Sequence, residues 1–143
     1  MALLTVYSPE GPSMLEFPGR KSWAGHLWLD HGDVGRLTPG HFLTLKLREG
    51  EHCLAGERFS FMAHESDVRT VFTLHSGQRS FMRLVIESKA VAGFGPTRWL
   101  AEPVTCQEAS HEAAAAQPVL LKRLEKSALD QVAREPFFPE CMR

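Results

Sequence analysis

GRLTPGHFLTLKLREGEHCLAGE, residues 35–57, contains two β-prone runs separated by a turn. In the first run, residues 41–47, a leucine recurs at every second position from Leu43. This is the period of a strand with one buried face. A turn that contains Gly50 leads into the second run, residues 52–57. Two runs joined by a short glycine-containing turn predict a β-hairpin in which Gly50 has a positive φ.

Short alternating runs of the same kind recur on both sides of this segment. They cover residues 3–7, 26–30, 34–37, 68–75, 81–87 and 99–104, and a short edge strand is expected at 14–17. Glycine-containing turns at 31–33 and 76–78 predict two more hairpins. A turn spacing of about 8–12 residues favours an antiparallel sandwich or barrel over a parallel sheet, which needs a helix between its strands. We therefore expect a mainly β fold, an antiparallel Ig-like sandwich, over residues 1–104.

The pattern changes to a helical one after Val104. Thr105 and Glu108 have the spacing of a capping box, in which the threonine hydroxyl accepts a hydrogen bond from the Glu108 N–H. Farther on, apolar residues at helical spacing form a stripe of Leu121, Leu124, Ala128 and Val132. Pro136 is expected to end this helix. Residues 105–143 are thus expected to be a helical extension that packs on the sandwich or on a partner.

The residues at the turns carry a resemblance to a known family. The segment LWLDHGDVGRLTPGHFLTLKLREGEHCL, residues 27–54, resembles the core of PEGA-like β-sandwich domains and related bacterial domains of unknown function. The matching positions are Asp30, Gly32, Val34, Gly35, Leu37, Gly40, Glu49, Gly50, Glu51, His52 and Leu54. LHSGQRSFMRLVIES, residues 74–88, resembles the closing hairpin of that family, with Gly77 at the turn.

This resemblance covers residues 3–104 and departs from the family at two points. His31 splits the usual Asp-Gly pair, and the lipoprotein signal of such bacterial relatives is missing. The resemblance implies a small Ig-like sandwich that serves as a binding or spacer module. It implies no catalytic residues.

Composition limits the classes of partner. The chain has 143 residues with 16 basic and 17 acidic side chains, a net charge of −1, so no broad basic field exists to hold nucleic acid. No apolar run approaches the ~20 residues of a membrane span. Residues 1–5 lack the basic start of a signal peptide. We expect a cytoplasmic protein if the chain is complete, and a cell-envelope protein if a signal peptide was removed.

The cysteines and histidines are the candidates for chemistry. Cys53, Cys106 and Cys141 are odd in number and widely spaced, which predicts idle thiols in a reducing compartment rather than a disulfide framework or a zinc site. There are seven histidines, but no strand carries two at the spacing of a metal site. His52 is expected to bond a neighbouring backbone group. The sequence therefore predicts no cofactor, no metal and no catalytic residue.

Two aromatic side chains lie on strand faces opposite the leucines. Trp28 and Phe42 are expected to point outward, where they either form a contact face or lie under the tail helix. The candidate binding residues are Trp28, Phe42, Leu121, Leu124, Val132, Phe137 and Phe138.

These observations favour a non-enzymatic binding or structural module whose partner is a protein or a second copy. One alternative is an interaction subunit that docks through its C-terminal helix. The other is a small metal protein or enzyme that uses histidines across strands.

Overall fold

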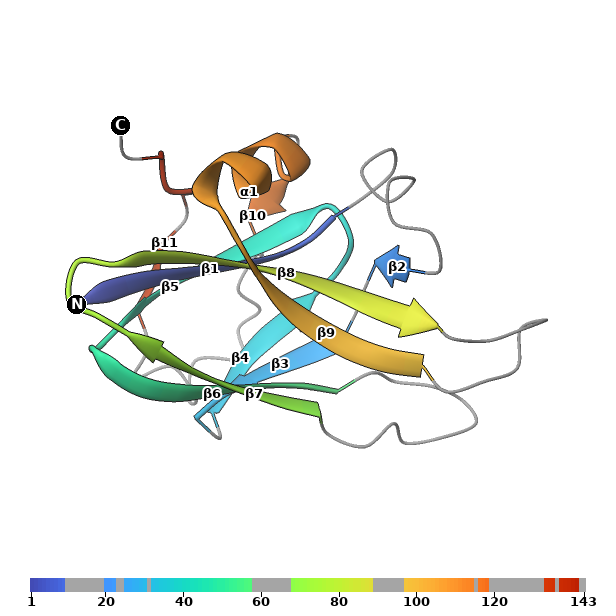
Figure 1. Cartoon of the computed structure of the whole chain (residues 1–143), viewed down its shortest axis with the longest axis horizontal. Helices are drawn as coiled ribbons and strands as arrows, with labels where there is room; N and C mark the ends of the chain where they lie inside the picture. The colour runs from blue at the N-terminus through green and yellow to red at the C-terminus, as the bar shows by residue number, and fades with distance from the viewer. Residues whose placement is uncertain are drawn as a thin grey trace.

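Two β-sheets packed face to face form the body of the protein, which confirms the mainly β prediction (Figure 1). The computed structural model describes residues 1–9, 20–22, 25–30, 32–57, 68–88, 97–114, 116–118, 133–135 and 137–141. The edge strand expected at 14–17 lies outside these residues. In Figure 1 the larger sheet, sheet A, lies above the smaller one, sheet B, and the helix lies on the side of sheet A that faces away from sheet B.

Sheet A has β1 at its centre. Its strands are β1 (Ala2–Ser8), β2 (Arg20–Ser22), β5 (His41–Leu47), β8 (Arg79–Ser88), β9 (Thr97–Val104), β10 (Gln117–Pro118) and β11 (Ala133–Glu135). β1 pairs antiparallel with β5 and parallel with β8. β9 runs antiparallel along β8, while β10 and β11 both pair with β5. The C-terminal tail thus contributes two short strands to the same sheet as the first strand.

Sheet B is antiparallel throughout and has the strand order β4-β3-β6-β7. Its strands are β3 (Gly25–Leu29), β4 (Gly32–Leu37), β6 (Gly50–Glu57) and β7 (Val68–Leu74). The hairpin expected at residues 31–33 is present as β3 and β4, with a bulge between Leu27 and Trp28.

Two of the expected hairpins are wrong. β5 belongs to sheet A and β6 to sheet B, so the turn before Gly50 carries the chain from one sheet to the other. The turn at Gly77 does the same between β7 and β8. Gly50 has the expected positive φ, +124°, and the φ of Gly77 is also positive, +77°. An alternating run buries one face whether its neighbour in sequence pairs with it or crosses to the facing sheet, so the pattern alone does not distinguish the two.

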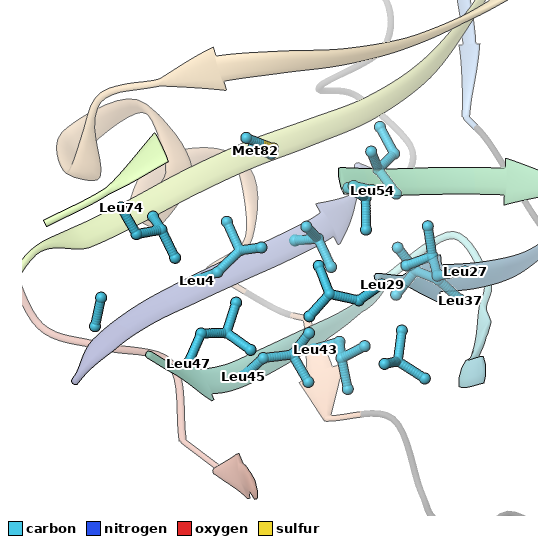
Figure 2. Packing of buried hydrophobic residues seen from close by; sticks show 14 residues of the cluster. Leu4, Leu27, Leu29, Leu37, Leu43, Leu45, Leu47, Leu54, Leu74 and Met82 are labelled. Carbon is cyan, nitrogen blue, oxygen red and sulfur yellow. The ribbon is translucent and has the colours of Figure 1, made fainter. Parts of the chain in front are cut away.

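The inner faces of the two sheets meet in a core built mainly of leucine (Figure 2). Its members are Ala2, Leu4, Val6, Leu27, Leu29, Val34, Leu37, Leu43, Leu45, Leu47, Leu54, Leu74, Met82 and Leu84. The three alternating leucines of β5 all point into it, as their spacing predicts. Phe72 and Ala101 pack against it from the edge of each sheet.

The outer face of sheet A has a cover of its own. Helix α1 (Cys106–Glu112) lies on it, and its buried Ala109 joins an aromatic cluster with Tyr7, Phe42 and Phe81. Thr105 caps this helix as predicted, because its Oγ1 accepts from the Glu108 N–H at 3.1 Å.

The structure describes only part of the segment in which a long helix is expected after Pro118. Its stripe of Leu121, Leu124, Ala128 and Val132 lies outside the described residues. Ala133–Glu135 was expected to form the last turn of this helix before Pro136. It is instead strand β11, so the helical prediction is wrong for these three residues. They pair antiparallel with Thr44, Leu45 and Lys46 of β5. The edge of β5 provides backbone partners that sequence periodicity does not reveal.

Leu45→Ala tests the packing of this core. Leu45 is 0% exposed, so we expect the substitution to lower the free energy of unfolding. A loss of about 2–5 kcal/mol in urea denaturation is the expected size for a buried leucine. Lys46→Ala is the matched control, because Lys46 is the exposed neighbour on the same strand. Equal losses for the two variants would contradict the described burial.

Candidate functional site

A buried polar network joins α1 to sheet A. Tyr7 on β1 is fully buried and donates its hydroxyl hydrogen bond to Glu112 Oε1 at the end of α1. Arg83 on β8 donates to both oxygens of Glu112, at 3.0 and 2.8 Å. Its Nε also donates to Glu102 of β9 at 3.2 Å. One guanidinium therefore holds two carboxylates from two different elements.

The electrostatics of this network favour anchoring over catalysis. Burial, and then the hydrogen bond and negative charge of Glu112, raise the pKa of Tyr7 well above its ordinary value. The phenol therefore keeps its proton and acts as a donor rather than as a base. The Arg83 and Glu112 side chains are only 10% and 9% exposed, which leaves little access for a substrate. We interpret the network as the attachment of α1 to the sheet.

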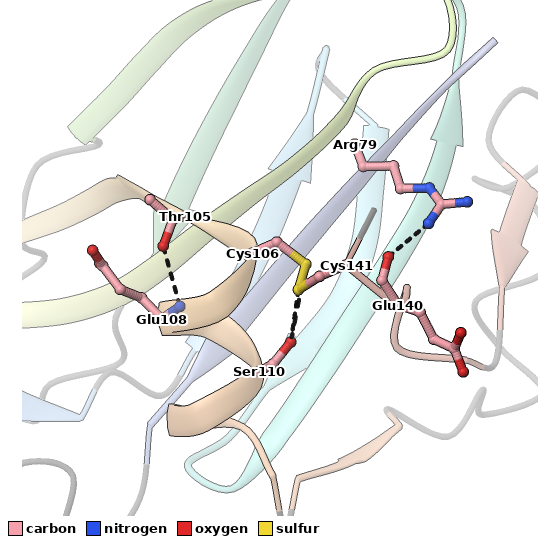
Figure 3. The surroundings of a disulfide bond; sticks show 7 residues. All are labelled: Arg79, Thr105, Cys106, Glu108, Ser110, Glu140 and Cys141. Atoms are coloured by element: carbon pink, nitrogen blue, oxygen red, sulfur yellow. Dashed lines mark hydrogen bonds between the residues drawn. A yellow bond between two sulfur atoms is a disulfide. The ribbon is translucent and has the colours of Figure 1, made fainter. Parts of the chain in front are cut away.

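The segment that contains Glu140 and Cys141 is held against α1 and β8 by several contacts, which we call the tail clamp (Figure 3). Cys106 at the start of α1 forms a disulfide with Cys141. Arg79 Nη1 donates to the Glu140 carbonyl at 2.6 Å, and Ser110 Oγ lies 3.3 Å from Cys141 Sγ. The disulfide, the arginine and the serine thus hold one short C-terminal segment.

Phe138 supplies the apolar part of this clamp. Its ring lies edge-on to Phe42, with centroids 5.3 Å apart, and 5.6 Å from the ring of Phe81. Aromatic contacts of this geometry add to the stabilisation from buried area. Phe42 is 5% exposed as a result. It points to the outer face of sheet A as its spacing predicts, where α1 and the tail cover it.

The disulfide corrects the expectation drawn from the cysteines. Cys106 and Cys141 are bonded to each other, so the prediction of three idle thiols is wrong for two of them, and Cys53 alone is free. An odd count leaves one cysteine over but does not prevent the other two from pairing. Their separation of 35 residues carries no local motif, so only the packing of the tail against α1 brings them together.

The disulfide predicts a thiol count and a stability change. The denatured chain should titrate one thiol before reduction and three after it, because Cys53 is the one free cysteine. Cys141→Ser should lower the free energy of unfolding by about 2–4 kcal/mol, since the bond restricts the unfolded chain. Cys53→Ser is the control and should leave the tail clamp intact. Three reactive thiols in the non-reduced chain would contradict the bond.

His52 lies near the start of β6, where the chain enters sheet B. Its Nδ1 lies 2.6 Å from Asp30 Oδ2 and its Nε2 lies 2.7 Å from the Arg48 carbonyl oxygen. Both neighbours are acceptors, so the ring satisfies both only as the imidazolium. Asp30 also accepts from the Cys53 N–H at 2.8 Å. The expected bond of His52 to a neighbouring backbone group is therefore present, and the Asp30 carboxylate accompanies it.

The pKa of His52 follows from these contacts. Burial taken alone lowers it, but the hydrogen bonds to Asp30 and to the Arg48 carbonyl, with the Asp30 charge, outweigh burial and raise it. A raised pKa means that the folded state binds the proton more tightly than the unfolded state. The resulting stabilisation is complete below the unfolded pKa and is lost as the pH rises through the folded pKa.

His52→Gln tests this pH dependence. The stability difference between wild type and variant should be larger at about pH 6 than at about pH 9. A loss of about 0.5–1 kcal/mol across this range is expected, because the Asp30 side chain is 47% exposed and solvent screens the pair. His75→Gln, at an exposed histidine beside the Gly77 turn, is the control. A difference that stays constant or grows with pH would contradict the imidazolium.

The described histidines do not gather into a metal site. His41 Nδ1 is engaged by Thr38 Oγ1 at 3.0 Å and by the Pro39 carbonyl at 3.2 Å. Within the parts of the chain that the structure describes, no three side chains of His, Cys, Asp or Glu are placed to hold a metal ion.

The outer face of sheet B differs from that of sheet A. Leu27, Leu54 and Leu74 point inward, so the residues next to each of them along its strand point to the outside. Trp28 lies opposite Ala55, and Cys53 lies opposite Val71. Val71 is 62% exposed. We call Trp28, Cys53, Ala55 and Val71 together the sheet-B face.

The other predicted binding residues lie elsewhere. Phe42 and Phe138 contact each other, so both are engaged within the chain. Phe137 is 47% exposed and lines an open hollow with Met1, Leu3 and Lys46. Leu121, Leu124 and Val132 lie outside the described residues.

Val71 was not among the binding residues predicted from sequence. The alternation of Phe72 and Leu74 with their neighbours on β7 was the signal that could have found it.

Comparisons with known proteins add no further identification. No protein-family model, curated protein or solved structure matches this chain. The PEGA-like resemblance therefore stays a prediction. Among the described residues no helix has the length and apolar character that crossing a membrane requires.

Proposed function

We propose that this chain is a non-enzymatic binding or structural module that presents the sheet-B face to a protein partner. The observation that carries the proposal is the difference between the two outer faces. On sheet A, α1 and Phe138 cover the aromatic residues and leave Phe42 5% exposed. On sheet B, Val71 is 62% exposed.

The composition of the sheet-B face suits a protein partner. Trp28 is half-buried, so part of its ring is already fixed and loses little entropy on binding. Arg69 and Glu51, both exposed, flank the apolar residues with one charge of each sign. An aromatic anchor with a polar rim is typical of protein interfaces.

The disulfide supports a location as well as a role. Disulfides persist in oxidising compartments and are rare in the reducing cytosol. The Cys106–Cys141 bond therefore favours the cell envelope or the exterior over the cytoplasm for this module. A binding or spacer role there agrees with what the resemblance to PEGA-like bacterial domains of Ig-like architecture implies.

The two alternatives involve residues other than the sheet-B face. Docking through a C-terminal helix concerns the stripe of Leu121, Leu124 and Val132, which lies outside the described residues; the described helix α1 is bound to its own sheet through Glu112 and Ala109. A metal protein or enzyme would use histidines that converge across strands, but among the described residues both nitrogens of His52 and the Nδ1 of His41 have other partners, and no three His, Cys, Asp or Glu side chains are placed to hold a metal ion.

A photo-crosslinking experiment tests the proposal. p-Benzoylphenylalanine replaces Trp28 in one variant and Gln107, an exposed residue of α1, in the control variant. Irradiation in the cells of origin should give a covalent adduct with a second protein at position 28 and none at position 107. An adduct at position 107 alone, or at neither position, would contradict the proposal.

A binding measurement then confirms the adduct. The captured protein, once purified, should bind wild-type chain, and Trp28→Ala should weaken that binding at least about tenfold, as expected for an aromatic anchor. Gln107→Ala should leave the affinity unchanged. Equal affinities for the two variants would show that the adduct arose from proximity alone.

A further inference from the structure

β7 ends sheet B with an edge that no described strand covers. β6 pairs with β7 along residues 68–74 on one side. On the other side, within the described ranges, no strand hydrogen-bonds to β7. β9 of sheet A lies near β7 on that side of the sandwich, but it carries Pro103, which has no N–H to donate. On this side of the sandwich, β7 is therefore the strand whose edge is suited to pair with a strand of another chain.

The edge also lacks the features that usually prevent strand addition. Its sequence, VRTVFTL, has no proline, glycine or lysine, and Arg69 is its one charge. Valine and threonine supply four of its seven residues, and both favour strands. Natural edge strands are normally short, charged, bulged or covered, and an edge without these devices is a template for another chain.

We infer that β7 pairs antiparallel with β7 of a second copy of this chain, about a two-fold axis through Val71. In this register Val71 faces Val71 of the second copy, and Arg69 faces Thr73 of the second copy. Every residue of Val68–Leu74 then has a cross-strand neighbour, since Val68 faces Leu74. A shift by two residues would leave residues unpaired at both ends. The two four-stranded sheets become one continuous sheet.

Charge complementarity favours a second copy as the occupant. Within each copy Thr73 lies opposite Glu51. Across the axis, Arg69 of one copy, Thr73 of the other and Glu51 of the other therefore lie in one row on the outer face. The arginine reaches over the small threonine toward the carboxylate, and the symmetry repeats this pair. The two copies of Arg69 stay about 13 Å apart along the strands, because four residues separate positions 69 and 73.

Apolar burial and backbone bonds act in the same direction. Val71 is the most exposed large apolar side chain among the described residues, at 62%, and the axis places it against its own copy. Strand pairing also satisfies edge N–H and C=O groups that otherwise bond only to water. Trp28 lies on β3, with β6 between it and β7, so the aromatic residue of the sheet-B face stays open in the dimer, while Val71 of the same face packs on its counterpart in the second copy. The dimer does not depend on the proposed function.

Sedimentation of the purified full chain tests the dimer. Wild type should sediment with twice the mass of one chain at micromolar concentration and above. Val71→Lys should shift the species to a monomer, because two ammonium groups would meet at the axis. Gln107→Lys adds the same charge on α1, away from the edge, and should remain dimeric. A far-ultraviolet spectrum and a melting curve for each variant show whether it is folded.

Cysteine pairing tests the register and does not depend on Val71→Lys folding. In a Cys53→Ser background, an equimolar mixture of Arg69→Cys and Thr73→Cys chains should form an intermolecular disulfide, because directly opposed Cα atoms lie within bonding range. Arg69→Cys alone should not, because its two copies lie too far apart.

Three results would overturn the inference. The first is wild type that stays monomeric across the concentration range. The second is a folded Val71→Lys variant that stays dimeric. The third is a mixture that crosslinks no faster than Arg69→Cys alone, which would leave the edge to an extended segment of a different protein.

Discussion

β1 is buried on both of its faces, and the arrangement of the chain around it depends on this constraint. Leu4 and Val6 point into the core between the sheets, while Thr5 and Tyr7 on the opposite face are also 0% exposed. A strand can have two dry faces only if a second layer covers the outer one. The segment after β9 provides that layer, and the disulfide and Arg79 hold its end in place.

The layer that covers sheet A includes buried charged side chains, and their pairing offsets the free-energy cost of removing them from water. Arg83 and Glu112 are both nearly inaccessible to water, and an unpaired charge there would be strongly destabilising. Nη1 of Arg83 donates to both oxygens of Glu112, and this pairing, with Tyr7 and Glu102 as further partners, satisfies the groups and also fixes the position of α1. The outer face of sheet A is thereby buried around Tyr7 and Phe42, whereas Val71 on the outer face of sheet B is 62% exposed.

Period-two alternation was enough to locate most of the strands. In β3 and β5 each apolar run has a side that must be dry, so the inward leucines and the outward Trp28 follow from spacing. The cap at Thr105 followed from local chemistry as well. The candidate site was less accessible from sequence. Phe42 points outward as expected, but only the fold decides that Phe138 covers it while Val71 stays exposed.

The amino-acid sequence by itself determined where most of the longer strands lie, which of their faces is apolar, and where α1 begins. These properties depend on neighbours a few positions away. The tertiary structure alone decided which strands pair, that the turns at Gly50 and Gly77 are crossings between sheets, and that Cys106 meets Cys141. The contact of Tyr7 with Glu112 spans 105 residues, and no local pattern encodes it. Packing two sheets and a tail around one strand brings such distant groups together.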